Sequence, residues 1–174
     1  MTDLPPYDPA TSPMPTSTRP GELLDRFLAR FIDGVLVGIV YAVVGLALIG
    51  GLLLGTIDSW FVTNLVTTVV LVGLQLGYFV YLDSTRGQTV GKMLLKLRVL
   101  GPQGGLPTME ESLRRNIWIA AGLAAVIPIV GSLVGGVAQL VAVIMIAVGI
   151  NGDTINRQAW HDHFAGGTRV VKEG

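Results

Sequence analysis

The sequence predicts an all-α, polytopic transmembrane helical bundle of four spans with a small cytoplasmic cap. Hydrophobic residues make up 51% of the 174 residues and charged residues only 14%, whereas soluble domains carry roughly 25% charged residues. The mean hydropathy is +0.61, and the apolar residues fall in long runs instead of a periodic scatter. These observations indicate that most apolar side chains face a lipid bilayer.

Charge and cysteine content exclude several classes of protein. The chain has 12 Lys+Arg and 12 Asp+Glu, so its formal net charge is zero and nucleic acid is not an expected partner. It has no cysteine, which excludes disulfides, thiolate metal sites and cysteine nucleophiles. Because no nucleophile, metal set or cofactor fingerprint is evident, we expect no enzyme activity, no cofactor and no metal.

The first 20 residues differ in composition from the rest of the chain. They contain six prolines among Thr and Ser and no apolar run, so residues 1–20 are predicted to be a disordered, proline-rich cytoplasmic tail. They also lack the apolar stretch of a secretory signal. Residues 21–172 are predicted to form one transmembrane domain.

Two long apolar runs predict the first two spans. Residues 31–55 are interrupted by one charge, Asp33, and residues 60–82 begin with Trp60 and carry Tyr78 near the other end. Aromatic residues in these positions are typical of membrane interfaces. Both runs exceed the roughly 20 residues that a helix needs to cross the hydrocarbon.

The third apolar run, residues 117–150, is too long for one crossing, since a straight helix of that length would measure about 51 Å. Pro128 and several glycines lie in its middle. The run is therefore predicted to be a hairpin of two short helices, 117–130 and 134–150. Gly131 and Gly135 have the GxxxG spacing that permits close approach of helices.

The distribution of basic residues supports four spans. All 12 lie before the first span, between the second and third, or after the last, and the links 56–59 and 127–136 hold none. Cytoplasmic loops collect Lys and Arg, and three spans would export Arg157, Arg169 and Lys172. We therefore predict a multi-pass protein of the cell membrane with both termini cytoplasmic.

The segment between the second and third spans carries signals of local structure. Thr108 and Glu111 have capping-box spacing, so a helix should begin near Met109. Charged and apolar residues alternate from Lys96 to Leu100, which predicts a short strand or hairpin.

Asp33 is the sharpest candidate for a functional group, because a carboxylate inside a span costs about 2.5 to 3.5 kcal/mol and normally faces protein, water or a partner. Arg26 and Arg30 precede it on the same side of a helix, so an ion pair is available. Two interpretations stay open. Asp33 is either part of an interfacial anchor neutralised by Arg30, or a site for a monovalent cation or a proton.

Other polar residues give weaker signals. Asn64 and Gln75 in the second span either bond across helices or line a pathway. His161 and His163 flank Asp162, but without further ligands they do not indicate a metal site.

Three segments together resemble the RDD family of bacterial membrane proteins. They are RFLARFID at residues 26–33, GQTVGKMLLKLRV at residues 87–99 and HDHFAGGTRVV at residues 161–171. The resemblance covers about residues 21–172. The arginine and two aspartates that name the family correspond to Arg26, Asp33 and Asp162. One departure is the second glycine before Thr168, where the usual form is Ala-Gly-Thr.

The resemblance implies a multi-pass membrane protein, and cation/proton exchange has been proposed for some members. Four spans would bring Arg26, Asp33 and Asp162 to one membrane face. The first hypothesis is a small transporter in which Asp33, paired with Arg26, binds a cation or proton, and four short helices would work as a homo-oligomer. Its supporting residues would be Arg30, Lys92, Gln75 and Asn64. The alternative is a non-transporting accessory or assembly protein whose charges hold a cap on the helices.

Overall fold

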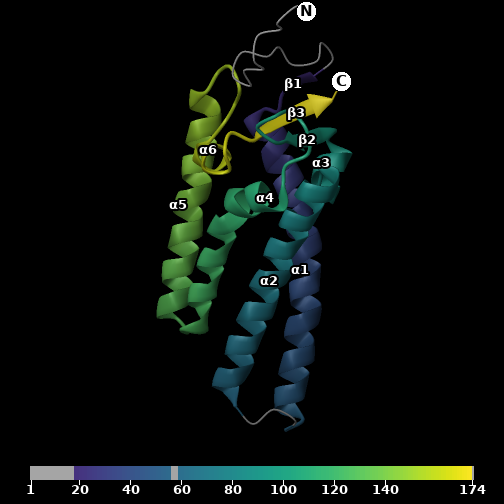
Figure 1. Ribbon diagram of the computed structural model, residues 1–174. Helices are drawn as coiled ribbons and strands as arrows, with labels where there is room; N and C mark the ends of the chain where they lie inside the picture. The colour runs from purple at the N-terminus through teal and green to yellow at the C-terminus, as the bar shows by residue number, and fades with distance from the viewer. Residues whose placement is uncertain (1–17, 56–58, 174) are drawn as a thin grey trace, which may run out of the picture.

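The computed structural model describes residues 18–55 and 59–173, and it is mostly helical (Figure 1). Three helices are long and apolar enough to cross a membrane. They are α1 (Leu23–Leu53), with Leu23–Leu48 as its spanning stretch, α2 (Trp60–Arg86) and α5 (Val130–Gly152). Large apolar side chains on these helices point outward, such as Val43 at 63% and Leu133 at 65% exposed. Such faces fit a lipid environment.

The helices α1 and α2 form an antiparallel hairpin (Figure 1). Ser59 caps the start of α2, because its side chain accepts a hydrogen bond from the Val62 N–H. The helix ends at Gly87, whose φ of 68° is left-handed and whose N–H donates to the Asp83 carbonyl. The two predicted spans are therefore present as helices, and both continue beyond the apolar runs at the charged end.

The segment after α2 folds as its local signals predicted. It contains α3 (Val90–Leu94), β2 (Leu97–Leu100) and α4 (Met109–Asn116). The capping box at the start of α4 is complete, since Thr108 Oγ1 accepts from the Glu111 N–H and Glu111 Oε2 accepts from the Thr108 N–H. The predicted strand and the predicted helix start are both confirmed.

The third apolar run forms a hairpin, but its first arm differs from the predicted span 117–130. That arm is a 3₁₀-helix, η1 (Ile117–Val126), which continues directly from α4. At about 2 Å per residue it rises only about 20 Å, short of hydrocarbon about 30 Å thick. The chain turns at residues 127–129, so α5 begins four residues before the predicted position 134. By length and hydropathy the described residues thus contain three candidate spans, and a fourth is a prediction only.

A small sheet joins both ends of the described chain. The strands β1 (Thr18–Pro20), β2 and β3 (Arg169–Glu173) lie in the order β1-β3-β2, and both pairs are antiparallel. We call these strands, α3 and α6 (Trp160–Phe164) the cap. The sheet corrects the all-α prediction. It also corrects the boundary of the predicted tail, because residues 18–20 form a strand, while residues 1–17 lie outside the described residues.

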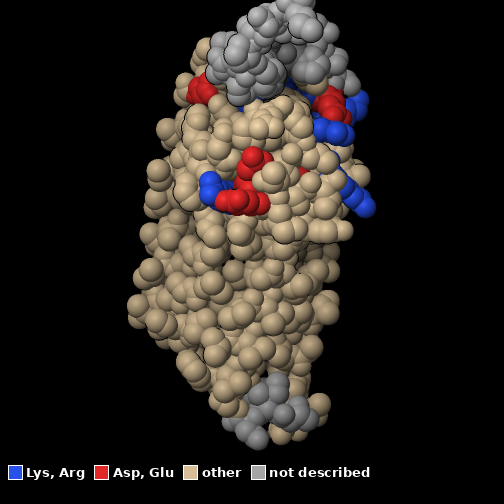
Figure 2. All heavy atoms as spheres, viewed as in Figure 1, with Lys and Arg blue, Asp and Glu red and all other residues tan. Residues whose placement is uncertain are grey.

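Two buried apolar clusters hold the cap and the helices together. Ala29 of α1 packs with Leu97, Val99 and Val170 of the sheet. A second cluster joins α2 to η1 through Val72, Phe79 and Ile119. The first cluster fixes the cap on the end of α1, which is the end where the charged residues gather (Figure 2).

Candidate functional site

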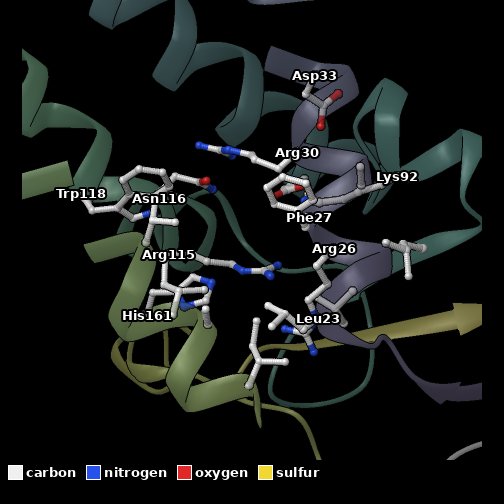
Figure 3. A pocket seen from close by; sticks show the side chains of 18 residues that line it. Leu23, Arg26, Phe27, Arg30, Asp33, Lys92, Arg115, Asn116, Trp118 and His161 are labelled. Atoms are coloured by element: carbon white, nitrogen blue, oxygen red, sulfur yellow. Dashed lines mark hydrogen bonds and ion pairs between the residues drawn. The ribbon is translucent and has the colours of Figure 1, made fainter. Parts of the chain in front are cut away.

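A cavity of about 170 Å³ lies where the cap meets the helices. Its walls come from α1, α2, α3, α4, η1, α5, α6 and the sheet. The charged residues in its lining are Arg26, Arg30, Asp33, Asp83, Lys92 and Arg115 (Figure 3). On the face seen in Figure 2, charged side chains are confined to the cap end and the remaining surface is uncharged. The cavity therefore lies at the boundary between an apolar bundle and a charged cap.

Asp162 is the centre of an ion-pair network beside the cavity. Its side chain is fully buried, with Oδ2 at 3.4 Å from Arg26 Nη1 and Oδ1 at 3.1 Å from Arg115 Nε. The Ala159 N–H and the Thr168 hydroxyl also donate to this carboxylate. Burial would raise the pKa of Asp162, but the Arg115 and Arg26 charges and the Ala159 hydrogen bond lower it overall. One carboxylate thus joins α1, α4 and α6.

The chain after Asp162 follows a tight path that depends on two glycines. Gly166 and Gly167 have φ values of 85° and 99°, which residues with a side chain rarely adopt. In this turn the N–H groups of Gly167 and Thr168 both donate to the Asp162 carbonyl. The additional glycine that departs from the family pattern is therefore accommodated in a turn that returns Thr168 to the Asp162 side chain.

Asp33 of α1 forms hydrogen bonds with α2 and with the start of α3. It is 1% exposed, and it accepts hydrogen bonds from the Tyr78 hydroxyl at 2.8 Å, the Thr89 hydroxyl at 2.6 Å and the Gly91 N–H at 2.8 Å. These donors belong to α2 and to the start of α3. Among the ion pairs of the described residues, none joins Asp33 to Arg26 or Arg30, although the Asp33 charge still acts on Arg30 from beyond ion-pair distance. Neutral donors from α2 and the start of α3 satisfy the carboxylate instead.

The start of α3 reaches Asp33 because Gly91 has no side chain. A Cβ placed on Gly91 would lie 2.0 Å from the Ala29 carbonyl oxygen, a backbone atom of α1. The two backbones therefore touch at this point, and only glycine permits the contact. The GQTVGK sequence of residues 87–92 supplies both this glycine and the Thr89 donor.

Lys92 and Asp83 form a second buried ion pair inside the cavity. Lys92 Nζ lies 2.5 Å from Asp83 Oδ1, and their side chains are 14% and 1% exposed. Burial lowers the pKa of Lys92 to about 8, an effect that Asp83 opposes and that the Arg115 and Arg30 charges reinforce. Lys92 therefore loses its proton more readily than an exposed lysine does.

Arg30 occupies the cavity without a carboxylate partner of its own. Its guanidinium carbon lies 3.5 Å from the centre of the Phe79 ring and 4.9 Å from that of Trp118. This is the geometry of a cation–π contact. Among the described residues, no carboxylate lies within ion-pair distance of Arg30.

The buried His161 should make the protein sensitive to mild acid. Burial lowers its pKa to about 3; the Asp162 charge opposes this shift, and the nearby Arg115, Arg26 and Arg30 charges reinforce it. The unfolded chain, with a histidine pKa of about 6.5, therefore binds a proton before the folded chain does, and stability falls as pH drops from about 6.5 toward about 3. We expect the melting temperature in detergent to be lower at about pH 5 than at about pH 7.5, and this difference to shrink in His161→Gln. The exposed His163 offers the matched control, since His163→Gln should leave the difference unchanged. An equal pH response in His161→Gln and the native protein would contradict this role.

The structure brings some predicted site residues together and leaves others apart. Arg26, Arg30, Asp33 and Lys92 line the cavity, and Asp162 pairs with Arg26 at its edge. Asn64 and Gln75 are not in its lining. Asn64 donates to the Ala125 and Val126 carbonyls of η1, and Gln75 accepts from the Tyr41 hydroxyl of α1. Both amides therefore join helices, which is one of the two roles predicted for them.

Sequence reasoning missed two members of the site, Asp83 and Arg115. Arg115 is 6% exposed and lies beside the buried Ser112 and Asn116 on one face of α4. That spacing of three and four residues is the signal that this polar face of α4 is buried. No group of three or more His, Asp and Glu side chains within residues 18–55 and 59–173 could hold a metal ion.

Comparison with known proteins gives one match. The family model described as RDD family matches residues 20–166. A search of curated proteins and a search of solved structures each found no match. The match covers all three long apolar helices, and it includes Arg26, Asp33 and Asp162. The chain is therefore an integral membrane protein that belongs to the RDD family.

Proposed function

We propose that this chain is a small transporter of the cell membrane that exchanges a monovalent cation for a proton at the Lys92–Asp83 pair. The observation that carries the proposal is a buried lysine–aspartate ion pair in the wall of a cavity between the apolar helices and the cap. A buried ionisable pair is costly in free energy, and such pairs in membrane proteins are typical of ion and proton pathways.

The exchange step follows from the charges of the pair. When the Lys92 ammonium releases its proton to water, its ion pair with Asp83 is lost and the aspartate keeps its negative charge. One monovalent cation can then take the place of the ammonium at the carboxylate. One charge leaves and one enters, so the exchange is electroneutral. The neighbouring Arg30 and Arg115 favour proton release, because they lower the pKa of Lys92.

In this mechanism the ion binds Asp83 and not Asp33, the residue that the sequence predicts. Asp33 was the first candidate, but three protein donors already occupy its oxygens. Asp83 instead contacts a group that can lose its charge. Arg26 and Asp162 then serve as supporting structure at the edge of the cavity.

The proposed orientation has the cap, the cavity and both termini in the cytoplasm. Its support is the charge distribution, since the basic residues gather at the cap end and cytoplasmic segments collect Lys and Arg. The pairing of β1 with β3 joins both ends of the described chain at that end. We also propose a homo-oligomer, because α1, α2 and α5 expose apolar faces and leave little room for a pathway within one copy.

Asp83→Asn should abolish exchange in proteoliposomes that contain a pH-sensitive dye. The assay starts with an acidic interior, and sodium or potassium added outside should drive protons out of the vesicles. In the native protein the rate should rise as pH increases through about 8, where Lys92 releases its proton. Asp25→Asn is the matched control, because Asp25 pairs with Lys172 in a separate contact between α1 and β3. Exchange in Asp83→Asn at the native rate would remove the pair from the mechanism.

The second candidate is a non-transporting accessory or assembly protein. It is favoured by the use of Asn64, Gln75 and Gln139 in hydrogen bonds between helices instead of along an open pathway. In this case native proteoliposomes should exchange ions no faster than protein-free vesicles. The same flux assay therefore separates the two candidates.

A further inference from the structure

The cavity holds more positive charge than its own carboxylates balance. Among its lining residues and their direct ion partners, four cations (Arg26, Arg30, Lys92 and Arg115) face three carboxylates (Asp33, Asp83 and Asp162). Lys92 forms an ion pair with Asp83. Arg26 and Arg115 both pair with Asp162. Asp33 accepts hydrogen bonds from neutral donors. His161 also lines the cavity and supplies no carboxylate. The cluster therefore carries one positive charge more than its carboxylates balance, and Arg30, on which the Asp83 and Asp33 charges act from a distance, forms no ion pair with either of them.

Each of the three arginines also has a buried nitrogen with no hydrogen-bond partner within the protein. Arg26 Nη2, Arg30 Nη2 and Arg115 Nη1 have no hydrogen-bond partner, although the side chains of Arg26 and Arg115 are only 10% and 7% exposed. An unsatisfied buried donor destabilises the protein, and more so when it is charged. The arginines reach the same space from α1 and α4 (Figure 3). Several guanidinium donors around one space are typical of oxyanion recognition.

We propose that this cavity binds one phosphate-bearing anion through Arg26, Arg30 and Arg115, and that in the membrane the anion is a phospholipid headgroup. The volume of about 170 Å³ far exceeds the roughly 10 to 15 Å³ that one water needs. A group of several non-hydrogen atoms therefore fits. The planar guanidinium groups supply paired donors for phosphate oxygens.

The apolar part of the cavity wall favours a lipid as the source of the phosphate. Beside the arginines, the wall contains Phe27 of α1 and Val143 of α5, which are 61% and 45% exposed on helices that face lipid. The cavity wall thus contains both charged donors and apolar surface. It also lies toward the end of the bundle where charged side chains gather (Figure 2), and lipid headgroups are expected at such an end. A phospholipid matches both features, with its phosphate on the arginines and its chains along α1 and α5.

The test uses the full chain purified from nanodiscs of phosphatidylglycerol and phosphatidylcholine in equal parts, with retained lipid counted by native mass spectrometry. Arg30→Gln is the main variant, because removing a guanidinium without a carboxylate partner orphans no acidic group. We expect it to retain phosphatidylglycerol about tenfold less. Arg30→Lys should keep the charge and the fold but bind less than the native protein, since an ammonium lacks the planar fork. Arg19→Gln, an exposed arginine that pairs with Glu22, is the matched control and should retain lipid normally.

A parallel titration with inorganic phosphate distinguishes the source of the anion. Retained lipid that is lost in Arg30→Gln supports the headgroup. Binding of inorganic phosphate alone, again lost in Arg30→Gln, supports the phosphate site and overturns its assignment to lipid. Equal binding by the native protein and Arg30→Gln in both assays would overturn the proposal altogether. Because neither readout depends on ion flux, its failure is distinguishable from failure of the exchange proposal.

Discussion

Asp162→Asn should destabilise the protein by about 3 to 5 kcal/mol, the usual effect of removing one partner from a buried ion pair. The asparagine keeps the shape of the side chain, and its oxygen can still accept from the Ala159 N–H. What disappears is the one negative charge that Arg26 and Arg115 share. Two buried guanidinium groups would then repel each other across α1 and α4 without a counterion between them.

Thermal or denaturant unfolding in detergent measures this loss. Glu173→Gln is the control, because its ion pair with Arg98 is about 40% exposed on both sides and such pairs contribute at most about 1 kcal/mol. The double variant Asp162→Asn with Arg115→Gln should recover part of the lost stability, since it removes one of the two orphaned charges. If Asp162→Asn unfolds like Glu173→Gln, the network around Asp162 does not hold the cap in place.

The features that sequence predicted correctly depend on neighbours along the chain. Apolar runs located α1 and α2, and the Thr108–Glu111 pair located the start of α4. The alternation after Lys96 located β2. Each of these signals is local, because helix periodicity, a capping box and strand alternation all lie within a few residues.

The partners of the charged residues were harder to predict, because their contacts join distant segments. Arg26 and Asp162 are 136 positions apart, and the resemblance to the family and the four-span topology predicted a shared membrane face but not their contact. Asp33 was assigned to Arg30 because the two lie one helical turn apart. The observed donors come from α2 and α3, 45 to 58 positions away. The strands β1 and β3 also escaped prediction, since each is short and pairs with the opposite end of the chain.

In the hairpin formed by the third apolar run, the conformation of the first arm could not be predicted from hydropathy. Hydropathy measures only whether a segment prefers lipid, so it does not separate a 3₁₀-helix from an α-helix. The ten residues of η1 are strongly apolar, like those of a span, but their path is set by contact with α5. The glycines of this run instead lie on the first turns of α5, where Gly131 and Gly135 contact η1.

Gly131→Ala should separate η1 from α5 and destabilise the protein by about 3 kcal/mol, at the upper end of the effect of overpacking. A Cβ on Gly131 would lie 1.8 Å from the Ala124 carbonyl oxygen and 2.8 Å from its carbon. Both are backbone atoms of η1, so no side-chain rotation relieves the clash. Gly135, one turn later, has the same relation to the Ala121 carbonyl at 2.6 Å. The GxxxG spacing therefore marks a line of backbone contact between the two arms of the hairpin.

Gly136→Ala is the matched control, because an added Cβ there meets nothing within 4 Å. On the same helix it should stabilise the protein by about 0.5 to 1 kcal/mol, since alanine loses less backbone freedom than glycine when a helix forms. The two substitutions add the same methyl group five residues apart and should move the melting temperature in detergent in opposite directions. Equal shifts would mean that η1 and α5 do not touch at Gly131. The hairpin would then owe its position to Asn64 and Gln139, whose side chains donate to carbonyls of η1.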